Sequence, residues 1–182
     1  DNFAGYSQPH SGNGYMGAIL TGTDRDFREY IQGELKSPMK AGQVYCVSFC
    51  YKLANGSMFA VDQLSVYFTE QKIANGNKTY LKSQLNNQEG LFLDNTEEWK
   101  HYCMLYTATG NESFFIIGNF KNYENTNYVV TGKDTKNKKG KMYAYYFFDD
   151  FEIRPLTDCH VCACVPKGLE TVLVDSSYTG GL

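Results

Sequence analysis

The chain has 182 residues, of which 42% are hydrophobic, 15% aromatic and 20% charged, and its formal net charge is −3. This length is enough for one domain with a sizeable buried core, and the absence of any run of 18 apolar residues excludes a membrane-spanning helix. The near-neutral charge argues against a dedicated nucleic-acid-binding protein, and the 15 tyrosines and 12 phenylalanines exclude low-complexity disorder for most of the chain.

Strand patterns follow one another along most of the chain. In the clearest, residues 43–53, Tyr45, Val47 and Phe49 share one face and alternate with more polar residues. The same reasoning predicts strands at residues 14–20, 27–35, 60–68, 99–108, 113–120 and 142–153. One short helix is predicted near residues 77–85. Seven or more short strands separated by Gly/Asn turns predict an all-β sandwich or barrel.

Six cysteines form an even set: Cys46, Cys50, Cys103, Cys159, Cys162 and Cys164. An even count in such a chain indicates an oxidising, extracytoplasmic compartment. Cys46 and Cys50 are about 13 Å apart along an extended strand, too far for a disulfide, which needs Cα atoms within about 7 Å. Cys103 meets one of the two across neighbouring strands, or else some of these residues are buried free thiols.

The composition changes after Pro155. The segment 158–164 contains Cys159, His160, Cys162 and Cys164, which together could supply four zinc ligands. Four ligands so close together in the sequence rarely coordinate one tetrahedral zinc ion, and a secreted context favours disulfides. A disulfide-bonded linker is therefore the preferred interpretation. We therefore divide the chain into a domain at residues 1–153 and a Cys-rich linker and tail at residues 154–182.

Several short motifs resemble one known family. They occupy residues 5–17, 28–32, 42–45, 60–62, 117–120 and 146–151. In this order they resemble the jelly-roll module of large secreted and outer-membrane proteins of Bacteroidetes-type bacteria, which is similar in fold to carbohydrate-binding modules and often accompanies OmpA-like domains. The resemblance covers about residues 5–153 and implies a two-sheet antiparallel β-sandwich of jelly-roll type.

The chain departs from this family in two ways. The family normally has a first strand before the Gly-Tyr motif that begins at Gly5, and the resemblance implies that this strand is either cut away or supplied by another segment. The OmpA-like domain is also missing from the printed sequence. Peptidoglycan binding is therefore not implied for this chain.

The last predicted strand places a carboxylate on an apolar face. Alternation puts one set of side chains on that face: Tyr143, Tyr145, Phe147, Asp149, Phe151 and Ile153. A carboxylate in such surroundings must be paired or coordinated. The family resemblance implies that Asp149 helps to hold a structural calcium ion, with backbone carbonyls and a first-strand carboxylate. The alternative is that Asp149 accepts hydrogen bonds from loop amides without a metal.

A candidate binding face lies on the strand at residues 27–35. Arg28, Tyr30 and Gln32 share one face of this strand, and sugars stack on aromatic rings while amides and guanidinium groups bond their hydroxyls. The alternative is that Tyr30 packs in the core and Arg28 pairs with a carboxylate such as Glu34. No catalytic motif accompanies the chain's three histidines, so we expect no enzyme activity.

Two functions remain open. The first is a non-catalytic structural or interaction module of a secreted or outer-membrane cell-surface assembly, with other surface proteins as partners. The second is a calcium-stabilised carbohydrate-binding module that recognises a polysaccharide. Both place the domain outside the cytoplasm, and neither involves nucleic acid or a membrane-spanning segment. Fold alone does not choose between them.

Overall fold

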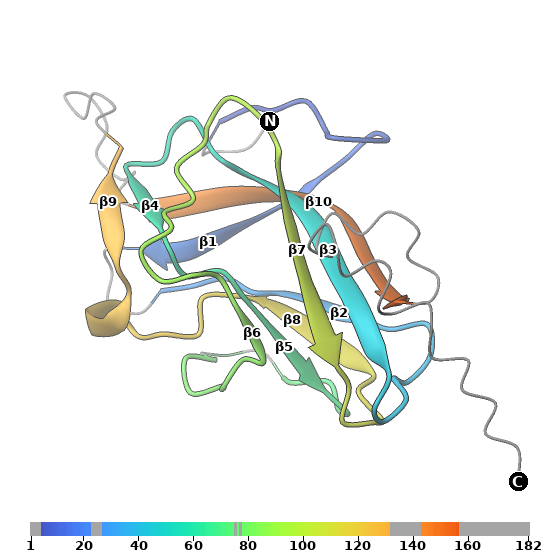
Figure 1. The fold of residues 1–182 in the computed structure, drawn as a ribbon. Coiled ribbons are helices and arrows are strands. Elements are labelled where there is room, and N and C mark those ends of the chain that lie inside the picture. The colour runs from blue at the N-terminus through green and yellow to red at the C-terminus, as the bar shows by residue number, and fades with distance from the viewer. Residues whose placement is uncertain (1–4, 23–26, 75, 77, 132–142, 157–182) are drawn as a thin grey trace, which may run out of the picture.

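Ten strands and one short 3-10 helix make up the part of the chain that the computed structural model describes, residues 5–22, 27–74, 76, 78–131 and 143–156 (Figure 1). The strands are β1 (Met16–Gly22), β2 (Ile31–Glu34), β3 (Val44–Leu53), β4 (Phe59–Val61), β5 (Ser65–Thr69), β6 (Leu85–Asn86), β7 (Lys100–Thr107), β8 (Phe114–Gly118), β9 (Tyr128–Val130) and β10 (Tyr143–Pro155). The helix, η1, covers Tyr123–Asn125. No helix in these ranges is long and apolar enough to cross a membrane.

The strands form two four-stranded sheets and a small ribbon. The first sheet has the order β1-β10-β3-β7, and the second sheet has the order β2-β8-β5-β6. Strands β4 and β9 pair separately and lie together at one end of the sandwich (Figure 1). Every pair of neighbouring strands is antiparallel. The predicted two-sheet antiparallel β-sandwich is confirmed.

The main core lies between the two sheets and is rich in aromatic rings. Phe68 of the second sheet stacks on Tyr106 of the first, with ring centroids 4.5 Å apart and an interplanar angle of 16°. Within the first sheet, Phe49 stacks on Tyr102 at 4.5 Å. Stacked pairs of this kind add about 0.5–1.5 kcal/mol to the stabilisation that comes from area burial. The predicted alternation of Tyr45, Val47 and Phe49 into the core is therefore confirmed, since all three are buried in it.

The opposite face of the first sheet carries a second apolar cluster, which we call the outer cluster. It contains Ile19, Ala54, Tyr143, Tyr145 and Phe147, with Tyr15 and Trp99 packed against it. Residues 5–15, which we call the covering loop, lie against this face. The loop is held by a hydrogen bond from the Trp99 indole Nε1 to the Gln8 carbonyl (3.0 Å) and by the edge-on contact of Tyr15 with Phe147 (4.9 Å).

A β-bulge in β10 changes which side chains face the core. The pairing of β10 with β3 shifts between Asp149 and Glu152, and Asp150 has a left-handed φ of 51°. The extra residue reverses the alternation. Phe151 and Ile153 therefore pack against the main core, whereas Asp149 faces the covering loop. The prediction that Phe151 and Ile153 share the face of Asp149 is wrong for this reason.

Two other predicted elements differ from the structure. Residues 60–68 form two strands, β4 and β5, because the fully buried Asp62 interrupts the run. Its carboxylate accepts hydrogen bonds from the Gly90 backbone N–H (2.7 Å) and the Asn127 side-chain amide (2.9 Å), so it ties two distant loops together. The predicted helix at residues 77–85 is wrong over its described part: residues 78–84 form irregular chain with one turn and one bend, and β6 begins at Leu85.

Candidate functional site

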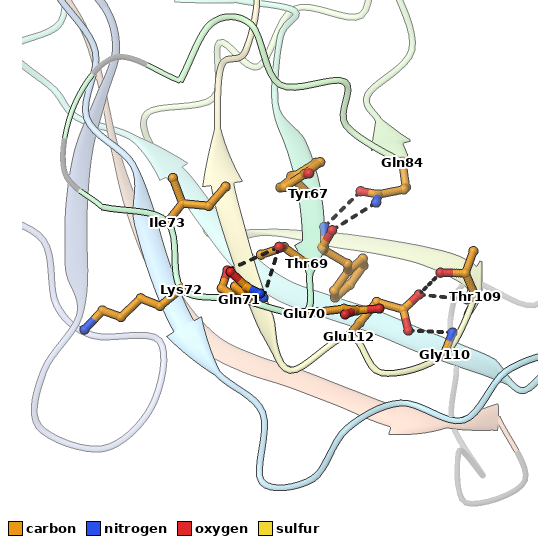
Figure 2. A pocket seen from close by; sticks show the side chains of 11 residues that line it. Tyr67, Thr69, Glu70, Gln71, Lys72, Ile73, Gln84, Thr109, Gly110 and Glu112 are labelled. Atoms are coloured by element: carbon orange, nitrogen blue, oxygen red, sulfur yellow. Dashed lines mark hydrogen bonds between the residues drawn. The ribbon is translucent and has the colours of Figure 1, made fainter.

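A polar hollow of about 490 Å³ opens at one end of the second sheet (Figure 2). Its walls come from three segments that are far apart in sequence: the end of β5 with the residues that follow it, Gln84 before β6, and the turn between β7 and β8. The lining side chains include Tyr67, Glu70, Gln71, Lys72, Gln84, Thr109 and Glu112. An aromatic ring, amides and a hydroxyl thus border one opening, and side chains of these kinds can stack on a ligand or form hydrogen bonds with it.

Two walls of this hollow are fixed by hydrogen bonds to the backbone. The Gln84 amide accepts a bond from the Phe68 N–H (2.9 Å) and donates one to the Phe68 carbonyl (3.1 Å), so it acts as a strand partner beyond the short β6. The Thr69 hydroxyl accepts from the Gln71 N–H (3.3 Å) and donates to the Gln71 carbonyl (3.2 Å). These local bonds hold the chain in a defined turn as it leaves β5.

The third wall is built on a buried carboxylate. Glu112 is 3% exposed and accepts hydrogen bonds from the Tyr106 hydroxyl (2.7 Å), the Thr109 N–H and hydroxyl (both 2.7 Å) and the Gly110 N–H (2.8 Å). Burial alone raises the pKa of Glu112, but the bonds from Tyr106 and Thr109 outweigh it and lower the pKa to about 2. Burial and the bond to Glu112 raise the pKa of Tyr106 to about 12. Glu112 is therefore an ionised clamp for this turn and is unsuited to donate a proton.

The predicted binding trio lies on and beside β2, next to this hollow. The Gln32 amide donates to the Ile73 carbonyl (3.2 Å) and accepts from the Ile73 N–H (3.1 Å), so it anchors one lining segment of the hollow. Tyr30 stacks on Phe120 at 5.6 Å. Arg28 is 8% exposed, and its guanidinium donates to the Thr126 hydroxyl (3.1 Å). Gln32 and Tyr30 thus contact residues that line the two hollows, while Arg28 is buried.

A second hollow, of about 610 Å³, lies near η1. Its lining includes Tyr80, which is 71% exposed, together with Glu89, Phe120, Asn122, Asn125 and Asn127. Phe120 also contacts Tyr67 of the first hollow, with ring centroids 6.2 Å apart. The two hollows are therefore linked by an aromatic contact. Sequence reasoning missed both, because no local motif relates segments that the fold alone brings together.

Asp149, the residue predicted to bind calcium, accepts hydrogen bonds from three backbone N–H groups. The His10 and Ser11 backbone N–H groups donate to its Oδ2 (2.8 and 3.2 Å), and the Asp150 N–H donates to its Oδ1 (2.8 Å). Calcium takes six to eight oxygen ligands. Both carboxylate oxygens thus accept N–H groups, and calcium at Asp149 stays a prediction of the family resemblance.

The three cysteines in the described ranges fall into two places. Cys46 and Cys103 lie on neighbouring strands β3 and β7, and their sulfurs are 3.6 Å apart. Cys50 is a buried free thiol, and its pKa is raised by burial and by the carboxylates of Asp150 and Asp149. Cys159, Cys162 and Cys164 lie outside the described residues. Disulfide formation stays a prediction for Cys46, Cys103 and these three cysteines.

No family model and no curated protein sequence matches the chain. Among solved structures, one described as "CBM4 structure and function" superposes with a TM-score of 0.41 and 13% identity over 80% of this chain and 73% of the other. The CBM22-1 xylan-binding domain of Paenibacillus barcinonensis Xyn10C superposes with a TM-score of 0.33 and 16% identity, over 81% of this chain and 89% of the other.

Proposed function

We propose that this domain is a non-catalytic, extracytoplasmic module that binds a polysaccharide along the two hollows, at the end of the second sheet and near η1. The observation that carries the proposal is the linkage of two polar hollows by the contact between Tyr67 and Phe120. Sugars place their apolar faces on aromatic rings while amides and carboxylates bond their hydroxyls. Two linked openings suit a ligand with several sugar units rather than a single small molecule.

The chemistry of the first hollow supports binding without catalysis. Glycoside cleavage needs a carboxylic acid that protonates the leaving oxygen, usually one with a raised pKa. The Glu112 carboxyl has a lowered pKa, and both of its oxygens accept hydrogen bonds from the turn that it holds. This residue therefore shapes the hollow and does not serve as the acid.

The test is binding of a panel of neutral and acidic polysaccharides, by affinity electrophoresis and then calorimetry with the corresponding oligosaccharides. Tyr80→Ala and Gln71→Ala each change an exposed side chain of one hollow. Loss of one stacking contact of about 0.5–1.5 kcal/mol predicts about 2- to 12-fold weaker binding for Tyr80→Ala. Tyr6→Ala, which removes an exposed ring from the covering loop, is the matched control. Equal loss in all three variants, or no binding to any polysaccharide, contradicts the proposal.

A second candidate function is the protein-interaction module of a cell-surface assembly, and β9 favours it. Tyr128 and Val130 are 46% and 63% exposed, and β9 pairs only with β4 among the described strands. An exposed edge strand with apolar side chains can accept a strand from another protein. If this is its role, Val130→Lys reduces association with other chains in sedimentation experiments and leaves polysaccharide binding unchanged.

A further inference from the structure

Three side chains with metal-binding atoms meet where the covering loop crosses the first sheet. They are His10 in the covering loop, Cys50 in β3 and Asp150 at the bulge of β10, and their ligand atoms all lie within 4.8 Å of one another. None of these residues lines either of the two hollows. The cluster is therefore separate from the proposed polysaccharide site and calls for its own explanation.

We propose that His10, Cys50 and Asp150 bind a thiophilic divalent cation of the zinc type. Imidazole nitrogen, thiolate sulfur and carboxylate oxygen are the three kinds of ligand found in protein zinc sites. With bond lengths of about 2.0–2.3 Å, tetrahedral ligands lie about 3.5 Å apart, so a small contraction of the cluster is enough to enclose the ion. The sulfur of Cys50 selects against calcium and magnesium, which take oxygen ligands.

The cluster is buried at Cys50 and open to solvent at His10 and Asp150. Cys50 is 6% exposed, whereas the side chains of His10 and Asp150 are 47% and 34% exposed. A cation can therefore enter from solvent and meet a buried sulfur at the bottom of the site. Three protein ligands with a solvent-facing fourth position is a known arrangement for zinc.

The loop and the bulge hold the ligands in place. Asp150 has a φ of 51°, a conformation that Asp and Asn tolerate better than other side chains, and it accepts hydrogen bonds from the Ser11 hydroxyl and from His10 Nδ1. Asp149 accepts hydrogen bonds from the backbone N–H groups of His10 and Ser11, and these bonds fix the path of the loop at the site. Its carboxylate also adds negative charge beside the cation without needing to bind it.

Cation binding exchanges the thiol proton of Cys50 for the metal ion. The Cys50 thiol loses its proton to solvent as the sulfur–metal bond forms, and no oxidant or reductant is involved. The bound ion then connects the covering loop to β3 and β10. The unfolded chain does not hold the three ligands together, so the ion binds the folded chain more tightly. The melting temperature therefore rises with the concentration of free cation.

The test is a titration of the full chain with cobalt(II), which reports a bound thiolate through its sulfur-to-metal charge-transfer absorption, followed by displacement with zinc. One equivalent saturates the wild-type absorption. Cys50→Ser removes the charge-transfer absorption, and His10→Gln and Asp150→Asn each weaken zinc binding at least about tenfold. Asn at position 150 keeps the left-handed backbone accessible, so this variant separates lost ligation from lost folding.

Two control variants, and melting temperatures measured with calcium and with zinc, complete the test. His101→Ala changes an exposed histidine on β7, opposite Cys50 in the strand register, and Cys162→Ser changes a cysteine beyond the described residues. Both keep the cobalt absorption if the site is correctly assigned. Persistence of the absorption in Cys50→Ser, loss of it in Cys162→Ser, or a melting temperature raised by calcium but not by zinc overturns the proposal.

Discussion

The buried carboxylate Glu112 provides a quantitative test of how the hollow is held. Its ordinary pKa is 4.5, and in the folded chain the pKa is about 2. Since one pKa unit corresponds to about 1.36 kcal/mol, the ionised form contributes about 3 kcal/mol to the free energy of unfolding at neutral pH. Glu112→Gln removes this charge and places an amide N–H₂ group where an oxygen now accepts the Gly110 N–H. We expect the variant to be destabilised by about 3 kcal/mol at pH 7.

The pH dependence follows from the sign of the shift. A lowered pKa in the folded state means that the unfolded chain binds the proton more readily, so the contribution is fully present above pH 4.5 and is lost as the pH falls toward about 2. The difference in unfolding free energy between wild type and Glu112→Gln is thus constant above about pH 5.5 and shrinks by most of its value between pH 4.5 and 2. Taking this difference removes the effects of other carboxylates that titrate in both proteins.

Urea denaturation followed by tryptophan fluorescence, in steps of pH, measures this difference. Glu34→Gln, at an exposed carboxylate, is the matched control and is expected to stay within about 0.5 kcal/mol of wild type. A Glu112→Gln effect below about 1 kcal/mol, or one that does not change between neutral and acidic pH, would refute the assignment of Glu112 as an ionised clamp.

Three further predictions test other parts of the fold. Gly33→Ala places a methyl group against the ring of Phe115 and is expected to lower the unfolding free energy by about 1–3 kcal/mol, measured by urea denaturation. Tyr146→Phe leaves the buried Val61 N–H without its acceptor, which lies 3.0 Å away, and is expected to cost about 1–3 kcal/mol in the same assay. Cys50, which is 6% exposed, should react with iodoacetamide at least about tenfold more slowly in the native than in the urea-unfolded chain, as followed by mass spectrometry, and equal rates would contradict its burial.

Much of the fold follows from local patterns. The alternation of residues 43–53 predicts β3 because a strand buried on one face imposes a period of two on its sequence. The same rule fails at Asp150, where one bulged residue reverses the pattern for Phe151 and Ile153. A bulge leaves little trace in a single sequence, since Asp at a left-handed position looks the same as Asp in a regular strand.

The candidate sites were harder to predict than the strands. Gln32 is predicted as a sugar-binding side chain, whereas its amide pairs with Ile73, a contact between residues 41 positions apart. Gln84 and Glu112 reach the first hollow from different loops, and His10 meets Asp150 across almost the whole domain. Contacts of this range depend on sheet order, which residue spacing does not reveal.

The docking of the covering loop has a consequence for the order in which the chain folds. The His10 N–H donates to Asp149, and these two residues are 139 positions apart. At a synthesis rate of about 5–20 residues per second, a ribosome needs about 7–28 s to make the segment between them. During this time β1, which pairs with β10, has no strand partner on the nascent chain among the described pairings. The covering loop is thus made well before the strand that secures it, and the growing chain carries an open β-edge until β10 is synthesised.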